Sequence, residues 1–235
     1  IVDTVLNTSD DKYETYSGVF AYYDKNSKFT ALTDLKGKTV YVAGQGSTPE
    51  YIFRALLEKR GISLNESESG SVLLDFSIPA SELAAALISG KVDYAVMPEP
   101  FATVAAVTKS QNNRQIYRAL DLQKLWKESF ETATFPMTMI VVRKDFAQKY
   151  PETVQNFLKE AEKSIVWTQQ NPKEAAVLVE KHTLGLKAQI AEKAIPNCAF
   201  GFAAAKESKN EIEAFLKVFL NKNRFFEKYR KDSVT

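Results

Sequence analysis

Residues Asp34–Ile62 read DLKGKTVYVAGQGSTPEYIFRALLEKRGI, and this stretch decides the fold. After a tight turn, the β-branched and aromatic run Thr39–Ala43 predicts a strand. A glycine-containing loop follows, and then a helix that opens with Ser47 and Glu50 in the spacing of a capping box and ends at Gly61. Strand, loop and helix in this order form the repeating unit of an α/β fold with a mostly parallel sheet.

The same alternation continues to about residue 134, so residues 28–134 are predicted to form one α/β lobe. Its further strands and helices are expected at Val72–Phe76, Glu82–Ser89 with Ser81 as cap, Val92–Met97, Phe101–Thr108 and Tyr117–Leu122. The third of these segments is almost continuously apolar, which is typical of a strand that is covered on both faces.

The remainder of the chain is expected to form a second lobe, from residues 1–27 and 135–235. Its predicted helices begin with a long amphipathic one from Pro151, followed by Lys173–His182, Leu186–Ala194 and Ser208–Asn221. Helices need a sheet to cover, so the strands at Ile1–Leu6, Tyr16–Tyr23 and Met137–Val142 are assigned to this lobe.

Composition excludes several classes of function. The 235 residues carry a net charge of +2, which gives no general attraction to nucleic acid. Cys198 and His182 are single residues of their type, so disulfides, multi-histidine metal sites and cysteine-ligated clusters are not expected. No apolar run is long enough to span a bilayer. The sequence therefore predicts no catalytic residues, no metal and no cofactor.

The loop between the first predicted strand and helix of the α/β lobe is the main candidate ligand site, and it comprises Gly44, Gln45, Gly46, Ser47 and Thr48. A helix N-terminus offers unpaired N–H groups and a partial positive charge, and glycine allows a ligand to approach the backbone. This combination suits a carboxylate, sulfonate or phosphate. The alternative is an ordinary helix cap. Tyr51 either stacks on the ligand or packs in the core.

A second candidate site follows the buried strand Val92–Met97. Glu99 stands between two prolines, which fix its direction, and Phe101 begins the next helix. The carboxylate is expected to bind a ligand amine or hydroxyl, to pair across a hinge, or simply to face solvent. Thr134, just before the strand at Met137–Val142, lies where a connection between lobes passes the cleft, although a plain hinge is also consistent with its position.

The sequence resembles the nitrate/sulfonate/taurine-type family of ABC-importer binding proteins. The resemblance lies in the order and spacing of three stretches: Asp34–Ile62, Ala80–Ala105 and Val141–Ser164. The motifs that carry it are the turn and strand DLKGKTV at Asp34–Val40, the helix start GSTPEY at Gly46–Tyr51 and the strand and turn GKVDYAVMPEPF at Gly90–Phe101. It covers about residues 31–221, and the family's usual N-terminal half-lobe has no counterpart.

The resemblance implies an α/β, two-lobed type II periplasmic-binding-protein-like fold with one lobe incomplete. It implies an extracytoplasmic receptor, periplasmic or lipid-anchored, that delivers a small anionic or heterocyclic molecule to an ABC permease without performing chemistry. In this reading the protein is a monomer that binds no nucleic acid. The alternatives are a ligand-sensing domain of a regulator and, less favoured, a pyrimidine-synthase-like enzyme. That enzyme uses a cysteine-rich iron motif, which a chain with one cysteine lacks.

Overall fold

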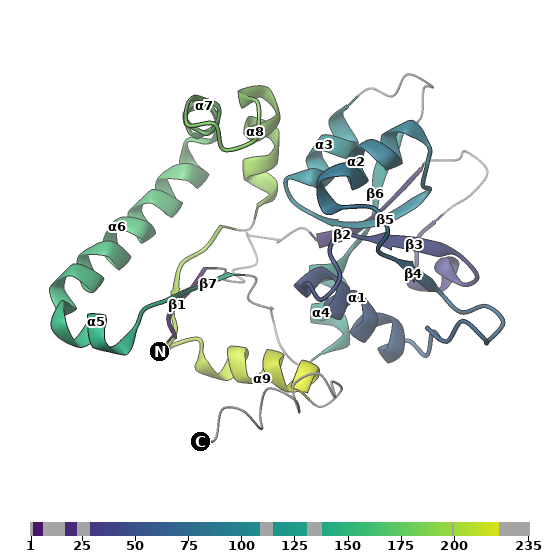
Figure 1. The fold of residues 1–235 in the computed structure, drawn as a ribbon, viewed down its shortest axis with the longest axis horizontal. Coiled ribbons are helices and arrows are strands. Elements are labelled where there is room, and N and C mark those ends of the chain that lie inside the picture. Colours follow the sequence, from purple (N-terminus) through teal and green to yellow (C-terminus); the bar gives the residue numbers. More distant parts are fainter. Residues whose placement is uncertain are drawn as a thin grey trace.

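The computed structural model describes residues 2–6, 17–22, 29–108, 115–130, 138–198 and 200–220. These residues form a five-stranded sheet of order β4-β3-β5-β2-β6 and a three-stranded sheet of order β7-β1-β8, which lie in two separate lobes (Figure 1). The two-lobed α/β class predicted from the sequence is therefore confirmed. The strands are β1 Val2–Leu6, β2 Ser17–Tyr22, β3 Thr39–Val42, β4 Leu73–Asp75, β5 Tyr94–Pro98, β6 Ile116–Asp121, β7 Thr138–Val141 and β8 Ala203–Ala204.

Helices account for most of the remaining described chain. They are η1 Leu32–Leu35, α1 Thr48–Lys59, α2 Ala80–Ser89, α3 Phe101–Val107, α4 Leu122–Ser129, α5 Lys144–Lys149, α6 Pro151–Gln170, α7 Pro172–Lys181, α8 Ala188–Ala194, η2 Ile195–Asn197 and α9 Lys209–Leu220. Two predicted helix ends are confirmed, because Gly61 follows α1 and Gly90 caps α2, both with positive φ. The predicted cap Ser81 is wrong, since α2 already begins at Ala80 after Pro79.

Placement of β2 is the main correction to the predicted lobes. The strand predicted at Tyr16–Tyr23 exists, but it inserts antiparallel between β5 and β6 of the large sheet. It does not join β1 in the small sheet, to which the sequence assigned it. Strands β3, β4 and β5 are parallel, so the large sheet is mostly parallel with one reversed strand.

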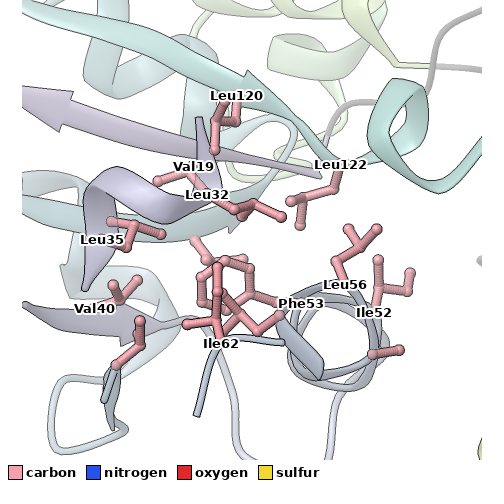
Figure 2. Packing of buried hydrophobic residues seen from close by; sticks show 14 of the residues in the cluster. Val19, Leu32, Leu35, Val40, Ile52, Phe53, Leu56, Ile62, Leu120 and Leu122 are labelled. Carbon is pink, nitrogen blue, oxygen red and sulfur yellow. The ribbon is translucent and has the colours of Figure 1, made fainter. Parts of the chain in front are cut away.

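Helices cover both faces of the large sheet, with α1 and α4 on one face and α2 and α3 on the other (Figure 1). Both faces need cover because successive side chains of a strand point to opposite faces of the sheet. Val40 and Val42 of β3 join the cluster that includes α1, whereas Tyr41 and the adjacent Ala43 face the cluster that includes α2 and α3. Figure 2 shows the first cluster, in which α1 packs its buried side chains against the sheet.

The small lobe buries much less apolar surface. Its own cluster of buried residues consists mainly of alanines from α7 and α8, together with Ile195. The long helix α6 has no buried residue at all, although its amphipathic pattern was predicted correctly. Phe157, Val166 and Trp167 of α6 are exposed. The described part of this lobe therefore has few buried side chains to stabilise it.

The C-terminal helix α9 returns to the large lobe. Its Phe215 is buried in the same cluster as α1 and meets Trp126 of α4 edge to face, with ring centroids 5.8 Å apart. The chain thus passes between the sheets after β1, after β6 and after β8. The predicted assignment of all residues after 135 to the second lobe is wrong for this helix.

Candidate ligand-binding site

The two predicted site loops begin side by side. β3 and β5 are parallel neighbours, and Ala43 N–H donates to the Val96 carbonyl at 3.0 Å just where β3 ends. The loop that contains Gly44 and the turn that contains Glu99 therefore leave the same carboxyl edge of the sheet. Open α/β sheets bind ligands at this edge.

The loop before α1 has an open, glycine-dependent backbone. Gly44 and Gly46 have φ of +80° and +75°, a region that side-chain-bearing residues rarely adopt. Gln45 and Gly46 are exposed. The Ser47 hydroxyl donates to the carbonyl of Gly44 at 2.6 Å and of Ala43 at 3.0 Å, so the loop's own backbone engages it. Ser47 makes no side-chain cap bond, and the predicted capping box does not form in that way.

Glu50 stabilises this loop instead. Its Oε2 accepts the Gly46 N–H at 2.6 Å, and its Oε1 accepts from Arg54 Nε at 2.6 Å. The residue is 5% exposed, so it is a buried part of the loop rather than a solvent-facing carboxylate. Its negative charge lies at the N-terminus of α1 and compensates part of the helix dipole there. The N-terminus of α1 therefore stabilises an anionic ligand group less than the sequence pattern suggested.

Three further predicted residues fall in different surroundings. Tyr51 is half-buried and packs against the large core cluster. Phe101 is half-buried at the first position of α3 and packs against the second cluster. Thr134 lies outside the described residues.

Glu99 points inward from its turn and is held by two donors. Its Oε2 accepts the Thr103 N–H at 3.0 Å, and its Oε1 accepts from Arg118 Nη2 at 3.2 Å. The side chain is 4% exposed. Burial raises the pKa of this carboxyl, while the hydrogen bonds from Thr103 and the charge of Arg118 act in the opposite direction. The structure thus shows an ion pair within the large lobe, and neither a pair across the hinge nor a solvent-facing carboxylate. The predicted contact with a ligand stays a prediction.

A hydrogen bond joins the lobes next to this ion pair. Asn197 of η2 donates from Nδ2 to Thr103 Oγ1 of α3 at 3.2 Å, and also to the Lys193 carbonyl at 3.1 Å. α3 and α8 lie side by side at this contact (Figure 1). Asn197 carries no signal in the sequence, because no local pattern marks a contact between residues so far apart in the chain.

A pocket of about 230 Å³ opens at the same lobe contact, between α3, β6 and α8. Its polar lining consists of Thr103, Arg118, Lys193 and Asn197, and its apolar lining of Ala102, Ala106 and Val107. None of these residues was predicted as part of a site. The only sequence signal near them was the turn at Glu99, which directs α3 toward this position.

The described residues offer little for covalent or metal chemistry. Burial, together with the nearby charge of Glu99, raises the pKa of Cys198 to about 12, so the thiol stays protonated at neutral pH and is a poor nucleophile. His182 is exposed at the end of α7. Within the described ranges, no three His, Cys, Asp or Glu side chains are grouped to hold a metal ion.

Similar structures have the same fold. The crystal structure of an ABC transporter from Parabacteroides distasonis aligns with 94% of this chain and 69% of its own, at 21% identity and a TM-score of 0.65. The periplasmic aliphatic sulphonate binding protein SsuA from Escherichia coli aligns with 94% of this chain and 64% of its own, at 16% identity and a TM-score of 0.68. No curated protein sequence matches the chain.

Two lobes and a mostly parallel sheet give the chain the fold of the periplasmic aliphatic sulphonate binding protein. Residues 14–175 match the model of the NMT1/THI5-like family, and the chain belongs to this family. The family resemblance inferred from the sequence motifs is therefore confirmed. None of the helices in the described part of the chain has the length and apolar character needed to cross a membrane.

Proposed function

We propose that this chain is the solute receptor of an ABC importer, which binds a small molecule between its lobes and presents it to a membrane permease. The observation that carries the proposal is the pocket at the contact between two lobes that have separate sheets. The family and the shared fold of the sulphonate binding protein support it. The receptor is proposed to act outside the cytoplasmic membrane, as a monomer and without performing chemistry.

Lobe closure is the proposed mechanism. A ligand that contacts both lobes favours the closed arrangement only to the extent that it binds that arrangement more tightly. The ligand contacts proposed from the large lobe are the loop Gly44–Thr48 and, at separate positions, Tyr51, Glu99 and Phe101. Exposure of Gln45 and Gly46, at the carboxyl edge of the sheet, supports the loop's role. For Glu99, the support is its position beside the pocket-lining residues Thr103 and Arg118.

Thermal denaturation and small-angle scattering with a panel of small anions, amides and heterocycles test this proposal. A receptor is expected to gain melting temperature with at least one compound, because a ligand that binds only the folded state stabilises it in proportion to its saturation. The same compound should reduce the radius of gyration. The variant Glu66→Ala, an exposed change in the connection between α1 and β4, should respond like the unaltered protein. A panel that produces neither effect would contradict the proposal.

A further inference from the structure

Three side chains form a continuous line of hydrogen bonds from the small lobe into the large one. Asn197 donates to the Thr103 hydroxyl across the lobe contact, and Thr103 bonds to Glu99 through both its N–H and its hydroxyl. We propose that Glu99 is a positioning residue for the contact between the lobes and acts on Asn197 through the Thr103 hydroxyl. The inference rests on the lobe movement of the proposed function, but it concerns the ligand-free chain.

The direction of each bond follows from the donors that are available. The Asn197 side chain lies 3.1 Å from the Lys193 carbonyl, and a carbonyl only accepts, so the Asn197 amide nitrogen must face it. The same nitrogen lies 3.2 Å from Thr103 Oγ1, so the Thr103 oxygen accepts there. The single hydroxyl proton of Thr103 is then left for the Glu99 carboxylate. The line therefore runs one way, from Asn197 through Thr103 to Glu99.

Burial strengthens the effect of Glu99 on this line. Thr103 and the Glu99 side chain are each 4% exposed, so water competes little for the hydroxyl. A hydroxyl that donates to a carboxylate is polarised, and its oxygen becomes a better acceptor, most of all where the local dielectric constant is low. The carboxylate also fixes the direction of the hydroxyl proton, which leaves the oxygen lone pairs for Asn197. Loss of the charge on Glu99 should therefore weaken a bond that Glu99 does not itself make.

A direct electrostatic effect of Glu99 on the small lobe is the competing explanation. Lys193 lines the same pocket as Thr103, and the charge of Glu99 contributes to the raised pKa of the Cys198 thiol. Neither of these interactions passes through the Thr103 hydroxyl, whereas the proposed one depends on it. The Thr103 hydroxyl is thus the group that distinguishes the two explanations.

A double-mutant cycle on the ligand-free chain tests the inference. Spin labels at Glu66→Cys in the large lobe and Lys181→Cys in the small lobe, both exposed positions, measure the ratio of molecules with separated lobes to molecules with the lobes in contact. The thiol of Cys198, with its pKa raised to about 12, reacts poorly with the labelling reagent. Asn197→Ala should raise the ratio by about 2- to 12-fold and Glu99→Gln by about 2- to 5-fold. The double variant should raise it no further than Asn197→Ala alone, because Glu99 then has no bond to strengthen.

Thr103 supplies the matched pair of controls. Thr103→Ser keeps the hydroxyl and should preserve the coupling between Glu99 and Asn197. Thr103→Val keeps the shape of the side chain, removes the hydroxyl and should abolish the coupling. The inference is overturned by additive effects of Glu99→Gln and Asn197→Ala, by a coupling that survives Thr103→Val, or by a ratio that none of these variants changes.

This inference and the proposed receptor function fail separately. A chain that becomes more compact with a compound of the panel, but in which the effects of Glu99→Gln and Asn197→Ala are additive, contradicts the inference and leaves the receptor function intact. Coupling through Thr103 in a chain that no compound compacts supports the inference and contradicts closure on a ligand.

Discussion

Two glutamates occupy the same helix position in different surroundings. Glu50 and Glu82 are both the third residue of their helices, α1 and α2. Glu82 is exposed, whereas Glu50 is buried and accepts the Gly46 N–H and the Arg54 guanidinium. The same residue type therefore gives a general dipole effect in one helix and a specific loop contact in the other.

Glu50→Ala is expected to lower the free energy of unfolding by about 1–3 kcal/mol, because it leaves a partly buried N–H and a guanidinium without their acceptor. Glu82→Ala removes only a surface charge from a helix N-terminus, and about 0.3–1 kcal/mol is expected. Urea denaturation of both variants measures the difference. Equal effects would show that the Glu50 contacts contribute nothing beyond the helix dipole.

The buried Glu99 predicts a pH effect. Burial raises the pKa of this carboxyl above its usual value of 4.5, so the folded protein holds the proton more tightly than the unfolded chain. Its contribution to stability is then fully present below pH 4.5 and is lost as pH rises through the raised pKa. The free energy of unfolding of the wild type, minus that of Glu99→Gln, should fall from pH 4 to pH 7. A difference that is flat or rises over this interval contradicts the assignment.

Among the elements, α1 and α6 differ most in what they bury. Leu56 of α1 lies fully buried in the large cluster, whereas Phe157 of α6 is 57% exposed. Leu56→Ala is expected to cost about 2–5 kcal/mol of unfolding free energy, because it removes buried apolar surface and leaves a cavity. Phe157→Ala, an exposed substitution, is expected to stay within about 0.5 kcal/mol. Chemical denaturation tests both, and a large loss at Phe157 would show that α6 is packed more closely than described.

Hydrophobic spacing predicted the type of most elements but not their partners. The aromatic, β-rich run at Tyr16–Tyr23 indicates a strand wherever that strand lies. The sheet it joins depends on contacts with β5 and β6, more than seventy residues later. The same limit applies to α9, whose pattern does not reveal that Phe215 packs on Trp126. Turn chemistry was more informative, as Gly61 and Gly90 show, because it acts within a few residues.

The common position of the two candidate loops could be predicted for the same reason, while their role in ligand binding stays a prediction. The loop at Gly44–Thr48 and the turn at Glu99 follow strands directly, so a strand-loop-helix pattern places both at one sheet edge. Lys193 comes from α8 and Asn197 from the following η2, and the sequence predicts only a helix closed by Pro196 in this segment. Their position opposite α3 depends on the arrangement of the lobes, which local sequence does not encode.

At the scale of the whole molecule, the hydrogen bond from Asn197 to Thr103 is expected to favour the closed arrangement of the proposed mechanism. Losing one neutral hydrogen bond costs about 0.5–1.5 kcal/mol, so Asn197→Ala should shift the ligand-free population toward the open form by about 2- to 12-fold. Small-angle scattering should show a larger radius of gyration. The control is Asn171→Ala, whose side chain donates to the Trp167 carbonyl within the small lobe. If both variants expand equally, the interlobe bond has no special effect.

The return of α9 to the large lobe limits how far the two lobes can separate. Only residues 205–208 separate β8 of the small sheet from the helix that holds Phe215 against Trp126. This spacer is folded into a turn, with Glu207 and Ser208 both donating to the Ala204 carbonyl. Four residues span at most about 14 Å when fully stretched. Unless α9 detaches from the large lobe, the distance by which the lobes can separate is limited by how far residues 205–208 can extend when that turn unfolds.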